Sequence, residues 1–104
     1  MYVQIIQYRY EGDVPSFTSG AESLAPTIAG LDGFVAKLWL DGDGPDFGGV
    51  YVWRDRAAAD AYQYGDLFTA VVAENPDVRD LTVRGYELWR TPTLETSGGL
   101  RLSA

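Results

Sequence analysis

The sequence contains no cysteine and no histidine, and both absences limit the chemistry that the chain can perform. Zinc sites in proteins are built mainly on Cys or His, and thiol nucleophiles and Ser-His-Asp triads need the same residue types. These classes of site are therefore excluded. A chain without cysteine also suits a reducing compartment, so we expect it to be cytoplasmic.

Positive charge is also scarce. The chain has 8 Lys and Arg residues against 15 Asp and Glu, for a net charge of −7, and Lys37 is its single lysine. Nucleic acids and anionic membranes bind clustered cations, so we expect neither as a partner. No apolar run approaches the ~18 residues of a membrane-spanning helix, and the N-terminal stretch lacks the basic start of a signal peptide.

The hydrophobic pattern predicts a mixed fold. Four stretches rich in β-branched and aromatic residues are typical of strands: residues 2–10, 34–40, 49–54 and 79–90. The first helix is predicted to begin at a capping box of Ser19 and Glu22, and Pro26 is expected to kink it or delay its start. The second helix follows Asp55 as its cap and breaks at Gly65. The order βαββαβ predicts an α+β, ferredoxin-like fold, with one antiparallel sheet and two helices on one face.

A chain of 104 residues suits one domain. We assign residues 1–92 to the ferredoxin-like domain and residues 93–104 to a C-terminal tail, either loose or docked on a partner subunit. The sheet face opposite the helices is predicted to carry an apolar set: Ile6, Tyr8, Leu38 and Val52. We expect the sheet of a homodimer partner to cover these side chains.

Two polar residues inside predicted strands are candidate catalytic groups. Lys37 lies between apolar neighbours, where desolvation lowers the pKa of an amine and lets it act as a base or nucleophile. It could equally extend its ammonium to the sheet margin, or pair with an acid such as Glu87. Gln7 could orient a ligand carbonyl or phenol, or simply pair across strands.

An aromatic group stands out in the second half of the chain. Tyr51 and Trp53 share one face of a strand, and helical spacing turns Tyr62 and Phe68 toward the sheet. These rings either fill the core or wall a small-molecule pocket. The alanines at 57–59 and 61 offer little volume, which favours an open cavity beside Trp53.

The loop "DGDGPDFGG" contains three aspartates but does not match a calcium loop. Pro45 occupies the third ligand position, and no glutamate ends the loop. We therefore expect a solvated turn and no metal site there.

Several segments together resemble the YdhR-like family of monooxygenases: "GFVAKLWL", "GGVYVWRD" and "AAADAY", with a last strand of similar length. This family belongs to the dimeric α/β-barrel superfamily, which also holds the antibiotic-biosynthesis monooxygenases. The resemblance implies two sheets that face each other across a dimer, and a ligand cavity between each sheet and its own helices. It further implies oxidation of polyphenolic aromatic substrates by O2 without metal or flavin.

A second branch of this superfamily degrades haem, and the chain departs from it at one position. That branch has a strand tryptophan, a helix aromatic and then a histidine ligand. Here Trp53 matches the tryptophan, but Val72 stands where the histidine is expected. Valine cannot bind iron, so the comparison argues against haem chemistry and we expect no cofactor.

The function that we expect is that of a monooxygenase, an oxidoreductase that uses O2 without metal or flavin on a small aromatic or polyketide-like substrate. The expected pocket walls are five rings: Trp39, Tyr51, Trp53, Tyr62 and Phe68. Lys37 or Gln7 would polarise a substrate oxygen. Two alternatives remain open: a non-catalytic dimeric module that binds a small ligand, and an isomerase or cyclase.

Overall fold

The computed structural model describes residues 1–100 and confirms the predicted fold class. Four strands form one antiparallel sheet in the spatial order β2-β3-β1-β4. Their bounds are β1 (Tyr2–Tyr10), β2 (Phe34–Asp41), β3 (Asp46–Trp53) and β4 (Val78–Glu87). Strands β2 and β3 continue further into the 41–49 loop than predicted, so the tight turn contains only residues 42–45.

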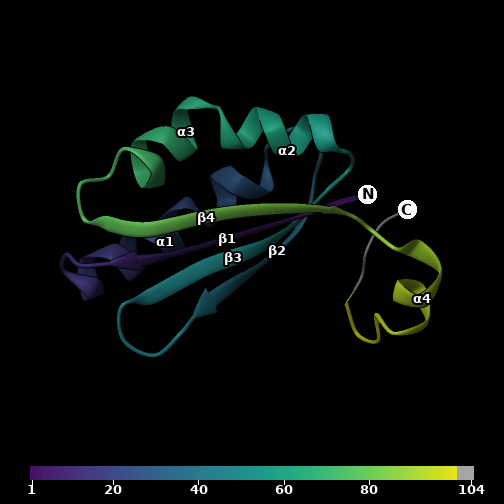
Figure 1. Cartoon of the computed structure of the whole chain (residues 1–104), viewed down its shortest axis with the longest axis horizontal. Coiled ribbons are helices and arrows are strands. Elements are labelled where there is room, and N and C mark those ends of the chain that lie inside the picture. The colour runs from purple at the N-terminus through teal and green to yellow at the C-terminus, as the bar shows by residue number, and fades with distance from the viewer. Residues whose placement is uncertain (101–104) are drawn as a thin grey trace.

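The helical segments pack against one face of this sheet. They are α1 (Val14–Ala29), α2 (Arg56–Gln63), α3 (Asp66–Phe68) and a π-helical turn η1 (Thr69–Ala73). Figure 1 shows α2 and α3 running along one side of the strands. The predicted break at Gly65 is confirmed, since this residue separates α2 from α3.

The start of α1 differs from the prediction. The helix begins five residues before Ser19, because Asp13 caps it with a side-chain oxygen that accepts the backbone N–H of Ser16 at 3.2 Å. Pro15 lies in the first turn, where backbone N–H groups have no acceptor within the helix, so its missing N–H costs nothing. Pro26 lies near the C-terminal end, where the helix has only three more residues to form. The amphipathic face of α1 is therefore longer than predicted and includes Phe17.

Strand register decides which residues face the helices. Ile6 pairs with Gly49 and Tyr8 pairs with Phe47, so both side chains lie on the helix face. The prediction that Ile6 and Tyr8 lie on the face opposite the helices was wrong. Alternation in the sequence separates the two faces of β1, but it does not tell which face the helices cover. Leu38 and Val52 do lie on the opposite face, which we call the open face; it also carries Val3, Ile5, Val50 and Tyr86.

A bulge near the start of β2 shifts one large side chain. The pairing register changes between Phe34 and Ala36, and Phe34 packs edge-on against Trp53 with ring centroids 5.9 Å apart. Phe34 therefore points to the helix face although Ala36 and Leu38 point to the open face. Beyond the bulge, Lys37 and Trp39 share the helix face, as predicted.

The core is organised around one buried amide. Trp53 is 0% exposed, and its indole N–H donates to the Gln4 side-chain oxygen at 3.0 Å. The Gln4 amide nitrogen in turn donates to the backbone oxygen of Ala59 at 3.2 Å. This chain of hydrogen bonds links β3, β1 and α2, and it satisfies the polar atoms that burial would otherwise penalise.

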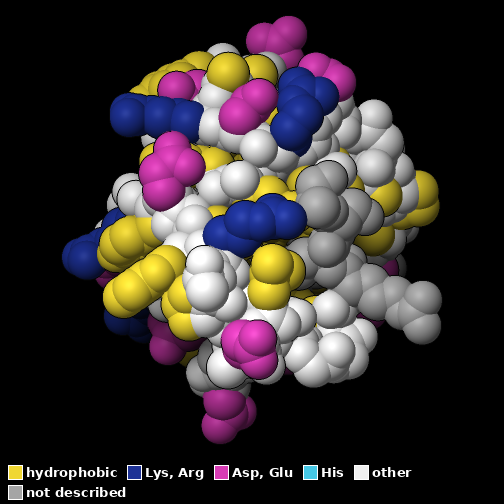
Figure 2. All heavy atoms as spheres, turned by 90° about the vertical axis from the view of Figure 1, so that its right-hand side faces the viewer, with side chains coloured by type: hydrophobic (Ala, Val, Ile, Leu, Met, Phe, Trp, Pro, Cys, Tyr) yellow, Lys and Arg dark blue, Asp and Glu magenta, His cyan; other side chains and the backbone are white. Residues whose placement is uncertain are grey.

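The C-terminal segment leaves the sheet. After β4 the chain forms a short helix, α4 (Arg90–Glu95), which lies apart from the sheet at one end of the molecule (Figure 1). The predicted tail thus contains part of a helix, and residues 101–104 lie outside the described residues. Figure 2 views this end and shows charges of both signs interspersed with hydrophobic side chains. No helix within residues 1–100 has the length and apolar character needed to cross a membrane.

Candidate functional site

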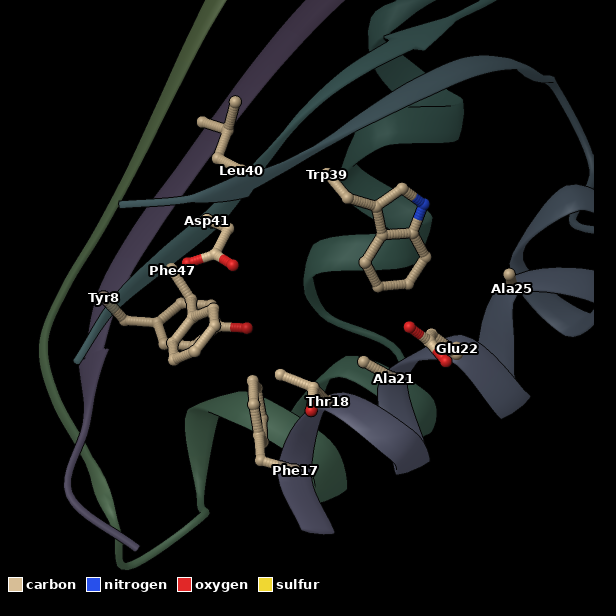
Figure 3. A pocket seen from close by; sticks show the side chains of 11 residues that line it. Tyr8, Phe17, Thr18, Ala21, Glu22, Ala25, Trp39, Leu40, Asp41 and Phe47 are labelled. Atoms are coloured by element: carbon tan, nitrogen blue, oxygen red, sulfur yellow. The ribbon is translucent and has the colours of Figure 1, made fainter. Parts of the chain in front are cut away.

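A cleft lies between α1 and the sheet, at the end where β2 and β3 turn. Its volume is about 320 Å³, and Figure 3 shows side chains of α1 on one side and of the strands on the other, with open space between them. We call it the outer cleft. Its main walls are Phe17, Ala21 and Ala25 from α1 and Tyr8, Trp39 and Phe47 from the sheet.

A smaller chamber continues from the outer cleft toward the core. This inner chamber has a volume of about 150 Å³ and shares Tyr8, Phe17, Ala21 and Trp39 with the outer cleft. Its other walls are mostly apolar, with three polar side chains at or near its surface: Lys37, Tyr51 and Tyr62. The two spaces therefore adjoin each other across these four shared side chains, and the inner one is the smaller.

The aromatic side chain of Phe17 fixes the mouth of this site. It stacks on Tyr10 with centroids 4.1 Å apart and contacts Phe47 at 5.2 Å and Tyr8 at 6.1 Å. Such contacts tie α1 to strands β1 and β3. The distance between helix and sheet, and so the width of the outer cleft, is set by these four rings.

Lys37 reaches the inner chamber from strand β2. Its Nζ lies 3.3 Å from the ring centroid of Trp39 and 4.4 Å from that of Tyr51. Both contacts have the geometry of cation–π interactions, which stabilise an ammonium that has lost water. Within residues 1–100 no carboxylate forms an ion pair with Lys37.

Gly49 makes room for this lysine. A Cβ atom built on Gly49 would lie 2.7 Å from Cε of Lys37 and 3.0 Å from Cε1 of Tyr51. The glycine faces Trp39 across the β2–β3 ladder, so the lysine stem crosses the strand over a position without a side chain. This glycine in the middle of a strand therefore has a steric reason.

Burial changes the proton affinity of the lysine. Desolvation in the aromatic surroundings lowers the pKa of Lys37 from 10.5 to about 7. Near neutral pH a substantial fraction of the molecules thus holds an uncharged amine in the chamber. An uncharged amine is a competent general base and nucleophile.

The pKa values of the chamber tyrosines change in the opposite direction to that of Lys37. Burial raises the pKa of Tyr8 to about 12 and raises the pKa values of Tyr51 and Tyr62 as well. The hydroxyl oxygens of Tyr51 and Tyr62 are 2.9 Å apart and share a hydrogen bond. All three phenols stay protonated at neutral pH and can donate hydrogen bonds, but they cannot serve as bases there.

The structure separates the predicted site residues into three groups. Lys37, Trp39, Tyr51 and Tyr62 meet at the inner chamber. Phe68 and Trp53 are buried in the core, where Tyr62 packs against both at 5.4 and 5.3 Å. Gln7 is exposed, and it pairs with Gly48 and Thr82, so it lies on the open face, away from the cleft.

On its core side Trp53 packs against Phe34, Tyr51 and Tyr62. A second cavity of about 310 Å³ lies between Leu31 and the alanines of α2, and Trp53 is among its lining residues. The cation at its rim, Arg54, is already paired with Asp32 at 3.4 Å and Asp55 at 3.3 Å. The cleft along α1, with its unpaired amine, is thus the better candidate site.

Three residues of the cleft escaped sequence analysis: Tyr8, Phe17 and Phe47. Tyr8 was assigned to the wrong face, Phe17 lies before the predicted helix start at Ser19, and Phe47 lies in the loop predicted to be a turn. The spacing of Phe17, Ala21, Leu24 and Ile28 along α1 is a helical stripe that begins before Ser19. Recognition of Asp13 as the cap would have revealed that stripe. No group of acidic side chains within residues 1–100 has the arrangement of a metal site.

Comparison with solved structures identifies relatives of this fold. SnoaB, a cofactor-independent oxygenase from Streptomyces nogalater, superposes with a TM-score of 0.67 at 18% identity, covering 86% of this chain and 94% of its own. The heme-degrader MhuD from Mycobacterium tuberculosis superposes with a TM-score of 0.63 at 19% identity over 86% and 96%. An antibiotic biosynthesis monooxygenase gives 0.65 at 22% identity over 85% and 98%. These likenesses show the shared fold.

Comparison of the sequence with known families assigns the chain more specifically than the fold does. No curated protein matches the chain significantly. The family described as "Putative mono-oxygenase ydhR", however, matches residues 3–99, which is nearly all of the chain. The protein therefore belongs to the ydhR mono-oxygenase family.

Proposed function

We propose that this protein is a cofactor-independent monooxygenase that oxidises a small aromatic or polyketide-like substrate with O2. The observation that carries the proposal is the position of the Lys37 amine. It lies at the inner end of an aromatic cleft, without an acidic partner and with its pKa lowered to about 7 by burial. The family match and the SnoaB-like fold support the same reaction class.

The proposed chemistry begins with proton removal. The Lys37 amine takes a proton from an acidic methylene or phenol and leaves an electron-rich anion. That anion reduces O2: a C–O bond forms at the former methylene carbon and the O–O bond then breaks. One oxygen remains as a carbonyl and the other leaves as water with the two substrate hydrogens. The substrate supplies all the electrons, so the balance requires no metal and no flavin.

The shape of the site favours a flat, conjugated substrate. Trp39, Phe17 and Phe47 offer ring faces and edges along the outer cleft. The phenolic hydroxyls of Tyr51 and Tyr62 lie at the inner chamber and can donate to a developing oxyanion. A polar oxygen of the substrate would thus point inward, while its rings occupy the wider space outside.

Oxygen uptake tests this function. An anthrone, a tricyclic compound with an acidic methylene between two rings, is added to the pure protein in an oxygen electrode. We expect catalysed uptake, a rate that rises as the pH passes through about 7, and loss of at least about 100-fold in kcat for Lys37→Met. Arg56→Gln, at an exposed position on α2, is the control and should keep the wild-type rate.

The opposite result is equally clear. Uptake that is equal for wild type and Lys37→Met would remove the amine from the reaction. If the protein binds the anthrone but never accelerates its oxidation, the monooxygenase proposal fails.

A binding module is the second candidate function. All three chamber tyrosines are held in their protonated form, and the sequence has no histidine to share the work of proton transfer. A lysine cation between two rings would then serve to hold an anionic aromatic ligand. Binding without turnover in the oxygen electrode supports this alternative.

The homodimer forms part of the same proposal. The open face presents apolar side chains to solvent, and Leu38 and Tyr86 are 48% and 51% exposed there. A second copy of this sheet would bury them. Its formation would leave the cleft accessible, because the cleft lies on the helix side.

Haem chemistry of the MhuD type does not fit the residues present. The wall of the inner chamber on the η1 side consists of hydrocarbon side chains: Leu67, Val71 and Val72. Val72 is 6% exposed and belongs to the core cluster. The position that corresponds to an iron ligand therefore offers none, and we derive no step through haem.

A further inference from the structure

The amine that serves as a base in the proposed reaction is also placed to form a covalent bond. Lys37 is the single lysine of the chain, and its Nζ lies inside a chamber that opens into the aromatic outer cleft. We propose that Lys37 also captures small aromatic aldehydes as a reversible imine, which makes the site a carbonyl-binding site. The inference uses the same cleft as the proposed oxygenation but does not depend on O2 or on that reaction.

The geometry favours a ring next to the nitrogen. The indole of Trp39 and the phenol of Tyr51 both lie within 4.4 Å of Nζ, measured to their centroids. Figure 3 shows Trp39 beside the open space of the outer cleft. A carbonyl group carried on an aromatic ring could approach Nζ from there while its ring packs beside Trp39. Proximity of this kind replaces an encounter in solution by a reaction within a complex.

Within residues 1–100 the amine has ring contacts but no ion pair. No carboxylate pairs with Lys37, whereas four arginines near the surface each have an acidic partner: Arg9, Arg54, Arg56 and Arg79. Gly49 keeps the space next to Cε free, so the lysine stem can adjust when a bond forms. Desolvation, which lowers the pKa of Lys37 to about 7, supplies the uncharged form that addition requires.

The step balances without an outside reagent. The amine nitrogen adds to the carbonyl carbon, a C–N bond forms, and a proton moves from nitrogen to oxygen. The carbinolamine then loses this hydroxyl as water, and a C=N bond remains. The protonated phenols of the chamber can donate a hydrogen bond to the carbonyl oxygen during addition. Hydrolysis reverses the sequence.

Trapping with borohydride tests this inference directly. The folded protein is incubated at pH 7 with 4-hydroxybenzaldehyde and sodium cyanoborohydride, which converts an imine into a stable secondary amine. Peptide mapping by mass spectrometry then measures label at each amine. Lys37 is the single lysine of the sequence, so label on a lysine is assigned to it unambiguously.

A matched control supplies an ordinary lysine in the same molecule. Arg56→Lys places one on the exposed surface of α2. At pH 7 we expect Lys37 to be labelled at least about tenfold faster than the lysine at 56, since each pKa unit changes the ratio of free amine to ammonium tenfold. Lys37→Arg should remove the label from this peptide, and Gly49→Ala, which crowds Cε, should slow it.

The outcomes separate this inference from the proposed function. Equal labelling of Lys37 and the lysine at 56 overturns the carbonyl-binding site. If trapping is absent while anthrone oxidation still requires Lys37, the amine is a base only. Fast trapping together with no oxygen uptake overturns the oxygenase proposal and leaves the carbonyl site. A circular dichroism spectrum like that of wild type confirms that each variant is folded.

Discussion

At the scale of single residues, the decisive feature is a cationic side chain placed among rings. The ammonium form of Lys37 loses water on folding and gains only the faces of Trp39 and Tyr51 in return. The free amine loses much less. Lys37 therefore holds its proton weakly. This property favours its use as a base, although it lowers the stability of the folded protein.

This arrangement predicts a pH dependence of stability. The pKa of Lys37 is about 7 when folded and near 10.5 when unfolded, so between these values unfolding takes up a proton. The loss of stability that Lys37 causes therefore becomes smaller as the pH rises above 7. Lys37→Met should be more stable than wild type at pH 7, and the difference should shrink by at most about 1.4 kcal/mol per pH unit up to pH 9. Urea unfolding at three pH values measures this; a difference that does not change with pH contradicts it.

At the scale of elements, the hydrogen bonds of Gln4 connect strands to helix. The Gln4 amide joins the indole of Trp53 on β3 to the backbone of Ala59 on α2. It is 2% exposed, so water cannot replace either bond. The second helix is therefore attached to the sheet by a specific polar contact in addition to ring packing.

Loss of this contact should be costly. Gln4→Leu leaves the buried indole N–H of Trp53 without its partner and removes the side-chain bond to the Ala59 carbonyl, and we expect a loss of about 1–3 kcal/mol in the free energy of unfolding. The matched control is Gln7→Leu in the same strand, whose side chain is exposed on the open face and should change stability by less than about 0.5 kcal/mol. Thermal or urea unfolding of both variants decides the matter. Equal losses would show that the buried bonds carry no net stability.

The same scale explains what the sequence could and could not predict. Alternation and β-branched content located all four strands, and Asp55 and Gly65 located the second helix and its break. The start of α1 was missed because Ser19 with Glu22 matches a capping box, whereas Asp13 provides the actual cap. The faces of β1 were exchanged because periodicity shows two faces without saying which one the helices cover. The pocket was expected beside Trp53 because the alanines of α2 offer little volume, whereas the cleft that holds Lys37 lies along α1.

At the scale of the site, the sequence indicated candidate residues better than it indicated where each one lies. Lys37 was found because a lone lysine among apolar strand residues is unusual, and the structure puts it in the chamber. The aromatic group was recognised, but Trp53 and Phe68 turned out to fill the core. Only strand register and the bulge at Phe34 decide which rings pack and which leave space, and neither can be read from local pattern.

At the scale of the whole molecule, the sheet has one covered and one uncovered face. On the open face, Ile5 and Val50 pair across β1 and β3, and Leu38 on β2 pairs with Val50. A domain of this size buries a modest share of its surface alone, so a partner at this face would add stability. The helix side already encloses the cleft.

Assembly can be tested by light scattering after gel filtration. We expect a dimer at micromolar concentration and a monomer for Leu38→Arg, because a charge at the centre of a sheet-to-sheet contact would be buried without a partner. Tyr64→Arg replaces a still more exposed residue outside the open face and should remain dimeric. A wild-type protein that elutes as a monomer would contradict the proposed assembly.

The placement of the cleft along α1 has a consequence for how such a protein could acquire new substrates. Thr18, Ala21 and Ala25 line the opening, and α1 has solvent behind it rather than another layer of core. Exchange of Thr18 or Ala25, which line only the outer cleft, for a larger side chain would reshape the entrance without touching the chamber of the amine. Related chains could therefore diverge in the molecules they accept through mutations on two turns of one surface helix, while the reactive centre is inherited unchanged.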